Sequence, residues 1–208
     1  MVQVKFPSFD AYAAAIQHAD TRMTLVGREQ GNWALAFSRV SEISIQWGVG
    51  GAAACEGGSV RGGLTLFLPM YKSDGLPGNE PRLLGNGQRL ESGSILILEP
   101  GADFCITATG AHRWSSIFVP FDSLNAMNVP ADKTGHSHRL LSPSGAGENL
   151  QSLVENLGAI LHNAPEALRS TSALGKARSK ISEAISKALT RKCDVISTQD
   201  GHNSLVHT

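Results

Sequence analysis

The sequence has 208 residues, of which 41% are hydrophobic, and its 18 basic and 18 acidic side chains give a formal net charge of zero. A chain of this length forms one domain with an appendage, or two small domains. The balanced charge excludes a global electrostatic field that would draw the protein to nucleic acid or to a membrane surface.

The cysteines and the apolar runs predict the compartment. Cys55, Cys105 and Cys193 are odd in number, widely spaced, and form no C-x-x-C motif, which argues against a disulfide framework. No apolar run reaches the roughly 18 residues of a membrane helix. Pro7 and Asp10 interrupt the segment where a signal peptide would have its apolar region. We therefore expect a soluble, cytoplasmic protein.

The first 120 residues have the pattern of a β-rich domain. A short helix is predicted from Phe9 to Ala19, with Ser8 or Asp10 as its N-cap. After this helix, apolar residues alternate with small or polar ones, as in half-buried strands. The continuously apolar runs 64–70 and 95–98 predict strands that are covered on both faces. The alternating sets are Trp33, Leu35 and Phe37, then Ile43, Ile45 and Trp47, then Phe104, Ile106 and Ala108, followed by the run 114–119.

Glycine-containing pairs mark the predicted turns between these strands. Three Gly-Gly pairs begin at Gly50, Gly57 and Gly62. Asn86-Gly87 lies between two apolar stretches, which is the pattern of a type I′ hairpin turn. Many short strands without intervening helices predict a sandwich or a barrel.

The character of the chain changes after Pro120. Residues 128–148 are rich in Pro, Gly, Ser and Asp, which predicts a linker or surface loop. Two amphipathic helices should follow, the first ending at Asn163-Ala164-Pro165 and the second starting near Glu166. The second helix has an apolar stripe that must be buried, and two-fold association is a common way to bury it. We expect a homodimer through Leu174, Ala177, Ile181, Ala184, Ile185 and Ala188.

No complete catalytic, cofactor or metal motif is present. Residues 48–53 match G-x-G-x-x-A, but no βαβ unit surrounds them, so a glycine-rich strand connection is favoured over a nucleotide site. His136 and His138 have the spacing of two ligands on one strand, but a metal site needs further ligands. His112 could face a pocket or cap the turn after Gly110. The lysines and arginines from 176 to 192 predict a solvated helix face rather than a DNA contact.

The residues around Pro100-Gly101 resemble a cupin barrel, in which a strand ending in Pro-Gly turns into the next strand. In metal-binding cupins a histidine follows shortly after, whereas this sequence has Asp103-Phe104 there. The paired histidines and glutamate of the first cupin motif are also missing. The resemblance therefore implies the barrel and argues against a bound metal.

A second resemblance covers most of the chain. The opening Phe9-Asp10-Ala11-Tyr12, the run Leu66-Phe67-Leu68-Pro69 and the segment 113–120 are similar to the N-terminal half of certain bacterial AraC-type transcription regulators. This resemblance implies a cupin-like domain that senses a small molecule, a helical segment that dimerises, and a C-terminal helix-turn-helix domain that binds DNA. Only fifteen residues follow Cys193, so the chain is either an excised N-terminal portion of such a regulator or a stand-alone sensor. We expect the first, with DNA binding from a domain absent from this chain.

These inferences combine into one expectation. The fold is mainly β, a cupin-like double-stranded β-helix (jelly-roll barrel) with a short N-terminal helix and a C-terminal pair of α-helices. Residues 1–127 form the sensing barrel, 128–148 a linker, 149–192 the dimerisation helices, and 193–208 a disordered tail or linker. We expect no cofactor and no catalysis; a cupin-fold metal-dependent isomerase or oxygenase using His112, His136 and His138 is the alternative. The predicted ligand-binding residues are Gln46, Trp47, Phe67, His112 and Trp114, with His112 and Trp114 on one strand face.

Overall fold

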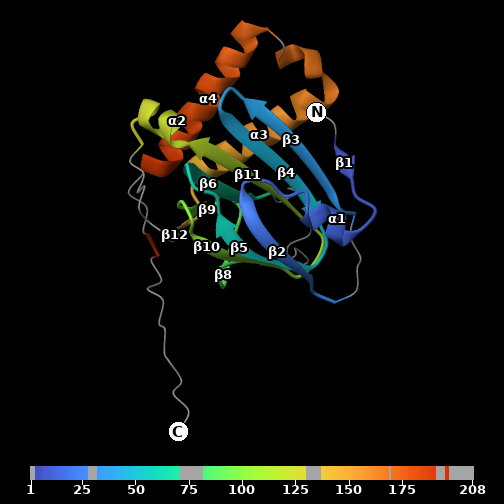
Figure 1. Cartoon of the computed structure of the whole chain (residues 1–208). Coiled ribbons are helices and arrows are strands. Elements are labelled where there is room, and N and C mark those ends of the chain that lie inside the picture. Colours follow the sequence, from blue (N-terminus) through green and yellow to red (C-terminus); the bar gives the residue numbers. More distant parts are fainter. Residues whose placement is uncertain are drawn as a thin grey trace.

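The computed structural model describes residues 3–27, 32–70, 82–129, 137–168, 170–190 and 195–196. Most of the expected tail, residues 193–208, lies outside these ranges. Two antiparallel sheets face each other, and two long helices cover the outer face of the larger sheet (Figure 1). Among the described residues, no helix is long and apolar enough to cross a membrane.

The larger sheet has the order β1-β3-β4-β11-β6-β9-β12-β13, and every neighbouring pair is antiparallel. Its central strands β11 and β6 join the N-terminal and C-terminal parts of the barrel. The strand bounds are β1 (Val4–Lys5), β3 (Ala34–Val40), β4 (Ile43–Gly50), β11 (His112–Pro120), β6 (Gly63–Pro69), β9 (Ile95–Leu98), β12 (His138–Leu141) and β13 (Val195–Ile196).

The smaller sheet has the order β2-β5-β10-β7-β8 and is also antiparallel throughout. Its strands are β2 (Ala19–Leu25), β5 (Ala53–Ser59), β10 (Asp103–Ala108), β7 (Leu83–Gly85) and β8 (Gln88–Arg89). The predicted hairpin joins the last two. Asn86 and Gly87 have φ angles of 49° and 78°, and two consecutive positive φ angles are what a type I′ turn requires.

Five helical segments complete the described chain. These are α1 (Phe9–Ala13), α2 (Phe121–Ala126), α3 (Gly145–Asn163), the 3₁₀ helix η1 (Pro165–Leu168) and α4 (Thr171–Thr190). Ser8 caps α1 by accepting a hydrogen bond from the Ala11 amide at 3.3 Å. This helix is shorter than the predicted span to Ala19, because β2 already begins there and pairs with β5.

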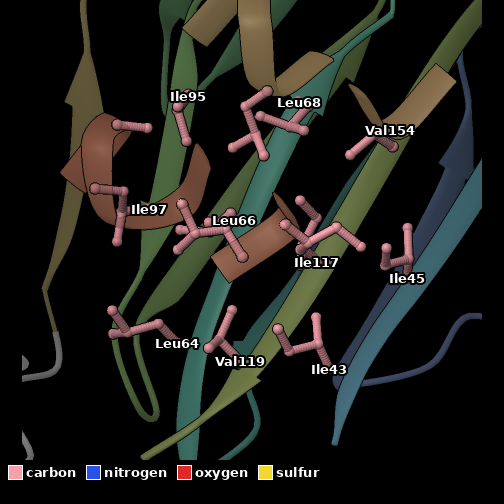
Figure 2. Close-up of a cluster of buried hydrophobic side chains, with 14 of the residues drawn as sticks. Ile43, Ile45, Leu64, Leu66, Leu68, Ile95, Ile97, Ile117, Val119 and Val154 are labelled. Atoms are coloured by element: carbon pink, nitrogen blue, oxygen red, sulfur yellow. The ribbon is translucent and has the colours of Figure 1, made fainter. Parts of the chain in front are cut away.

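The larger sheet divides two apolar cores, since successive side chains of a strand point to opposite faces. On β6, Leu64, Leu66 and Leu68 face the helices, while Thr65 and Phe67 face the smaller sheet. Figure 2 shows the helix-facing core, in which side chains from β4, β6, β9 and β11 gather with Val154 of α3. Burial on both faces explains why the runs 64–70 and 95–98 are continuously apolar.

A buried glutamine ties α3 to the barrel. The Gln151 amide nitrogen donates to the Pro69 carbonyl at 2.9 Å, and its carbonyl oxygen accepts from the Gly93 amide at 2.9 Å. Nearby, the indole of Trp47 donates to the Val154 carbonyl at 3.2 Å. These bonds fix the helix on the sheet as part of the same packed body.

The apolar stripe of α4 packs within this chain. Ile181, Ile185 and Ala188 are buried in the helix-facing core, and Leu174, Ala177 and Ala184 are partly buried against it. The sequence predicted a dimer because this apolar stripe must be buried against another apolar surface. The sheet and α3 supply that partner, so the stripe by itself no longer requires a second copy.

Three further parts of the chain differ from expectation. Strands β2 and β5 were not anticipated, and Gly57-Gly58, expected to be a turn, lies inside β5. Gly48 and Gly50 lie inside β4 rather than in a connection. Within the expected linker 128–148, residues 138–141 form β12, which pairs with β9, and α3 begins at Gly145. Burial of Leu140 and Leu141 explains why this segment joins the sheet.

Candidate ligand site

A cavity of about 60 Å³ lies between the two sheets. A buried water needs about 10–15 Å³ of cavity volume measured in this way, so the space corresponds to about four to six waters. The cavity is lined by residues of α1, of the segment that joins α1 to β2, and of strands from both sheets. The lining residues are Tyr12, Ile16, Gln17, His18, Ala19, Thr21, Met23, Ala53, Cys55, Thr65, Phe67, Leu98, Phe104, Ile106, Ala108, His112, Trp114 and Ser116.

The lining is mainly apolar and contains no lysine, arginine, aspartate or glutamate. A few hydroxyl, imidazole and thiol groups interrupt the hydrocarbon surface. An apolar wall with a few placed polar groups is the usual composition of a small-molecule site.

Trp114 forms one wall and is held from three directions. Its indole nitrogen donates to the Tyr12 hydroxyl at 3.0 Å, and its ring stacks on Phe67 with centroids 5.7 Å apart. Gly48 provides the space for the ring, since a Cβ there would lie 2.1 Å from an indole carbon. Burial raises the pKa of the Tyr12 hydroxyl, against the smaller lowering effect of the indole bond, so this hydroxyl stays protonated at neutral pH.

His112 shares the cavity-facing side of β11 with Trp114, as their spacing of two residues predicts. Its Nδ1 atom lies 3.1 Å from the Gly110 carbonyl oxygen, so the ring both lines the cavity and binds the preceding turn. Burial lowers the pKa of His112 below its usual 6.5, while the backbone of Gly110 and Gly51 acts in the opposite direction. The imidazole is therefore neutral at pH 7.

Thr65 contributes a buried hydroxyl with no hydrogen-bond partner in the described part of the chain. The residue is 6% exposed and faces the cavity from the centre of the larger sheet. An unsatisfied buried hydroxyl costs about 1–3 kcal/mol. On the opposite wall, burial raises the pKa of the Cys55 thiol to about 12, so this thiol is also neutral.

The turn expected from the cupin resemblance is present. The Ala102 amide donates to the Glu99 carbonyl at 2.9 Å, and Gly101 has a φ of 71°. Proline followed by a glycine of positive φ is the arrangement of a type II turn. Phe104, at the place where metal-binding cupins carry a histidine, lines the cavity and gives it a hydrocarbon wall there.

Two of the predicted ligand-binding residues lie elsewhere. Trp47 points to the opposite face of the larger sheet, where its ring packs beside Gly158 of α3. Gln46 is 2% exposed, and its side-chain oxygen accepts from the Gln17 amide at 3.1 Å. Gln46 lines a neighbouring hollow that shares Gln17 and His18 with the cavity. The structure thus brings together Phe67, His112 and Trp114.

The His18 ring stacks on Phe118 where the cavity meets this neighbouring hollow. Their centroids are 4.6 Å apart and the planes differ by 3°. Burial, followed by the charge of Arg39, lowers the pKa of His18. Both histidines of the lining therefore favour the neutral form.

The histidines proposed for a metal-dependent enzyme do not form a described cluster. Within the residues that the structure places, no three His, Cys, Asp or Glu side chains gather into a metal-binding group. His138 lies on β12 opposite Leu98, and His112 lies on β11. His136 falls outside the described residues.

Several lining residues carried no signal in the sequence. Tyr12 and Thr65 reach the cavity because α1 closes one end of the barrel and β6 crosses its centre. Met23 and Cys55 come from β2 and β5, the two strands that the pattern did not reveal. The alternation of Met23 and Leu25 with Arg22 and Thr24 is the one signal that could have indicated β2.

Two facing antiparallel sheets and a Pro-Gly turn between β9 and β10, with a cavity between the sheets, form a cupin-like barrel, as the sequence predicted. No protein-family model matches the sequence, and no curated protein matches it significantly. Among solved structures, the AraC-like transcriptional activator CuxR superimposes with a TM-score of 0.66 at 13% identity, over 96% of this chain and 73% of CuxR. The resemblance to AraC-type regulators is thereby confirmed at the level of the fold.

Two other solved structures are more distant. ToxT from Vibrio cholerae gives a TM-score of 0.39 at 10% identity, over 90% of this chain and 61% of ToxT. The ethanolamine utilization protein Q from Salmonella typhimurium gives 0.32 at 9% identity, over 49% of this chain and 95% of that protein. CuxR is the one of these three whose score carries an argument about the fold.

Proposed function

We propose that this chain is the effector-sensing part of an AraC-type transcription regulator and that it binds a small molecule between its two sheets. The observation that carries the proposal is the mainly apolar cavity between the two sheets, in a chain whose fold is that of an AraC-like activator. The unsatisfied Thr65 hydroxyl in its wall supports a ligand rather than simple core packing, since side chains of a filled core leave few such groups.

The proposed regulator senses its effector and does not transform it. Phe67, His112 and Trp114 contact the ligand, and no cofactor takes part. The ligand released from the protein should therefore be chemically unchanged after long incubation, which mass spectrometry of the extracted ligand can establish. Conversion to a product that depends on the protein would support the enzymatic alternative instead. A regulator of this kind acts in the cytoplasm.

Ligand binding can be tested by thermal unfolding against a library of small molecules. A ligand that binds only the folded state at one hundred times its Kd stabilises it by about 2.7 kcal/mol, which corresponds to a rise in Tm of roughly 5–11 °C for a chain of this size. Ala108→Leu fills the cavity and should abolish the rise. Ala159→Leu makes the same change on an exposed part of α3 and should preserve it. If the Ala108→Leu variant still shows the ligand-induced rise in Tm, the ligand binds outside the cavity.

We further propose that the C-terminal helices mediate a homodimer. Leu174, Ala177 and Ala184 are only partly covered within the chain, and Ile160 on α3 is 42% exposed. Sedimentation of the unsubstituted chain at micromolar concentration should give the mass of a dimer. The double variant Ile160→Glu/Ala177→Glu should give the mass of a monomer. A monomer in the unsubstituted chain would rule this part of the proposal out.

We also propose that DNA is bound through a helix-turn-helix domain of the full-length regulator and not through α4. The cationic side chains of α4 are exposed, and two of them already have acidic partners: Arg178 pairs with Glu42 at 3.2 Å and Lys187 with Glu183 at 2.6 Å. This supports a solvated helix face. The reading frame of the natural gene tests the assignment directly, because it should continue into a helix-turn-helix region. A frame that ends at Thr208 would contradict it.

A further inference from the structure

We propose that the ligand of the cavity is a small uncharged molecule, mostly hydrocarbon, whose single polar group binds the Thr65 hydroxyl. This inference rests on the proposed function and specifies the chemical class of the effector. It follows from the charge, the hydrogen-bonding capacity and the shape of the cavity wall.

The wall offers no opposite charge to a charged ligand. No lysine, arginine, aspartate or glutamate is among the lining residues. The cavity histidines and Cys55 favour their neutral forms because they are buried. A carboxylate, phosphate or ammonium group would lose its water without gaining an opposite charge, which strongly disfavours its entry.

Thr65 is the polar group of the wall that most needs a partner. Its neighbours across the sheet are Phe118 on β11 and Leu98 on β9, and neither side chain can accept or donate a hydrogen bond. A hydroxyl can both donate and accept, so it can bind an alcohol, a ketone or an amide of the ligand. A ligand with one such group would satisfy an oxygen that the protein leaves unsatisfied.

The remaining contacts suit a hydrocarbon body. Phe104 and Ile106 line the cavity from the smaller sheet, and Phe67 and Trp114 line it from the larger sheet. The space is smaller than the cavity of about 150 Å³ that accepts benzene in an engineered protein. Met23 can enlarge it, because an unbranched thioether changes rotamer easily. The ligand is therefore of the size of a short alcohol or slightly larger.

Three probes with one chain length and different charge test the inference: 1-butanol, butyrate and butylammonium. In ¹⁵N-NMR titrations, butanol should shift the amides of Thr65, Phe104 and Ile106, and the two ions should leave them unchanged. Ions that bind these residues as well as butanol would overturn the inference on ligand class while leaving the proposed function intact. If no probe of any charge shifts these amides, the inference on ligand class fails, and the thermal-unfolding screen decides the proposed function separately.

The role of Thr65 is tested by Thr65→Val, which removes the hydroxyl and keeps the shape of the side chain. The variant should fold and have a higher Tm, because it loses a polar group that has no partner. Its affinity for butanol should fall about tenfold, the usual effect of one hydrogen bond, while its affinity for xenon stays the same. Thr24→Val makes the same change on the exposed side of β2 and should alter neither affinity. Equal butanol affinity in Thr65→Val and the unsubstituted chain would overturn the assignment.

Discussion

His112 is a neutral imidazole in the cavity wall, and its burial makes the stability of the protein depend on pH. Its pKa is lower in the folded chain than the 6.5 expected after unfolding. Between these two values the unfolded chain binds a proton that the folded chain does not, so stability falls as the pH falls. The stabilisation of the folded state that depends on neutral His112 is complete above pH 6.5 and is lost as the pH falls toward the pKa of His112 in the folded chain.

We therefore expect the Tm to decrease when the pH is lowered from 7.5 to 5, and to decrease less in His112→Gln. The pKa of His18 is lowered as well, so part of the slope should remain in this variant. Thermal unfolding monitored by circular dichroism at several pH values measures both slopes. Identical slopes in the two proteins would contradict the burial of a neutral His112.

Gly48 shows how a residue without a side chain determines the wall of the site. A Cβ at this position would meet the Trp114 ring at 2.1 Å, and the ring is already held by Tyr12 and Phe67. Overpacking of this kind typically costs about 1–3 kcal/mol. Gly48→Ala should lower the free energy of unfolding by that amount in chemical denaturation.

Gly175→Ala is the matched control. Gly175 lies in α4, and beyond its own helix backbone a methyl group there would meet no heavy atom within 4 Å. Alanine in a helix interior is favoured over glycine by about 0.8–1.0 kcal/mol, so this variant should be more stable than the unsubstituted chain. If both substitutions changed the free energy of unfolding in the same direction, the contact between Gly48 and Trp114 would not explain the effect.

At the level of single residues, the sequence allowed part of the site to be predicted. His112 and Trp114 share a strand face because their spacing is two, and this follows from strand geometry alone. Gln46 and Trp47 are adjacent, so a strand cannot direct both to the same side. The isolation of the Thr65 hydroxyl depends on Phe118 and Leu98, which are distant in sequence. No local pattern carries that information.

Helix α4 is an integral element of the fold, because its apolar stripe closes the helix-facing core. Ile185 is fully buried there. Removing such a side chain costs about 2–5 kcal/mol, so Ile185→Ala should lower the denaturation midpoint clearly. Val26→Ala truncates an aliphatic side chain at a 44% exposed position just after β2, away from the helices, and should change the stability by no more than about 0.5 kcal/mol. Equal effects would mean that α4 does not pack on the sheet.

The elements that could be predicted are those with a strong local signal. The continuous runs became β6 and β9, the Asn-Gly pair became a hairpin, and α3 ends at Asn163, before Ala164-Pro165. β5 was missed because Gly57-Gly58 has the composition of a turn. Inside the barrel these glycines permit close strand contact, since a Cβ at Gly57 would lie 2.0 Å from the Asp20 carbonyl oxygen. That need arises from tertiary packing and is not visible in the local sequence.

For the whole molecule, the packing predicts that barrel and helices unfold together. The helix-facing core joins six strands of the larger sheet to α3 and α4, and Gln151 bonds α3 to the end of β6 and to the turn that precedes β9. Helical signal in far-UV circular dichroism and tryptophan fluorescence should therefore change at the same denaturant concentration, as in a two-state transition. If the helical signal were lost at a lower denaturant concentration, the helices would unfold as a separate unit, as the predicted boundary at residue 148 implies.

The overall fold was predicted through resemblance, and the position of the helices was not. The cupin-like turn and the run of short strands indicated the barrel, and the shared fold with CuxR confirms it. An amphipathic stripe shows only that a helix needs an apolar partner. Whether that partner is a second chain or the outer face of the same sheet depends on whether that face is itself apolar. The alternate residues Leu64, Leu66 and Leu68 make it so.

The alternation along β6 also determines how near the inside of the barrel is to its helices. Thr65 borders the cavity, and its two sequence neighbours, Leu64 and Leu66, are buried among the side chains that support α3 and α4. The wall between cavity and helices is one strand thick. If the proposed effector moves the backbone at Thr65, both leucines move with it, so the shortest route from the cavity to the helices is a single peptide bond.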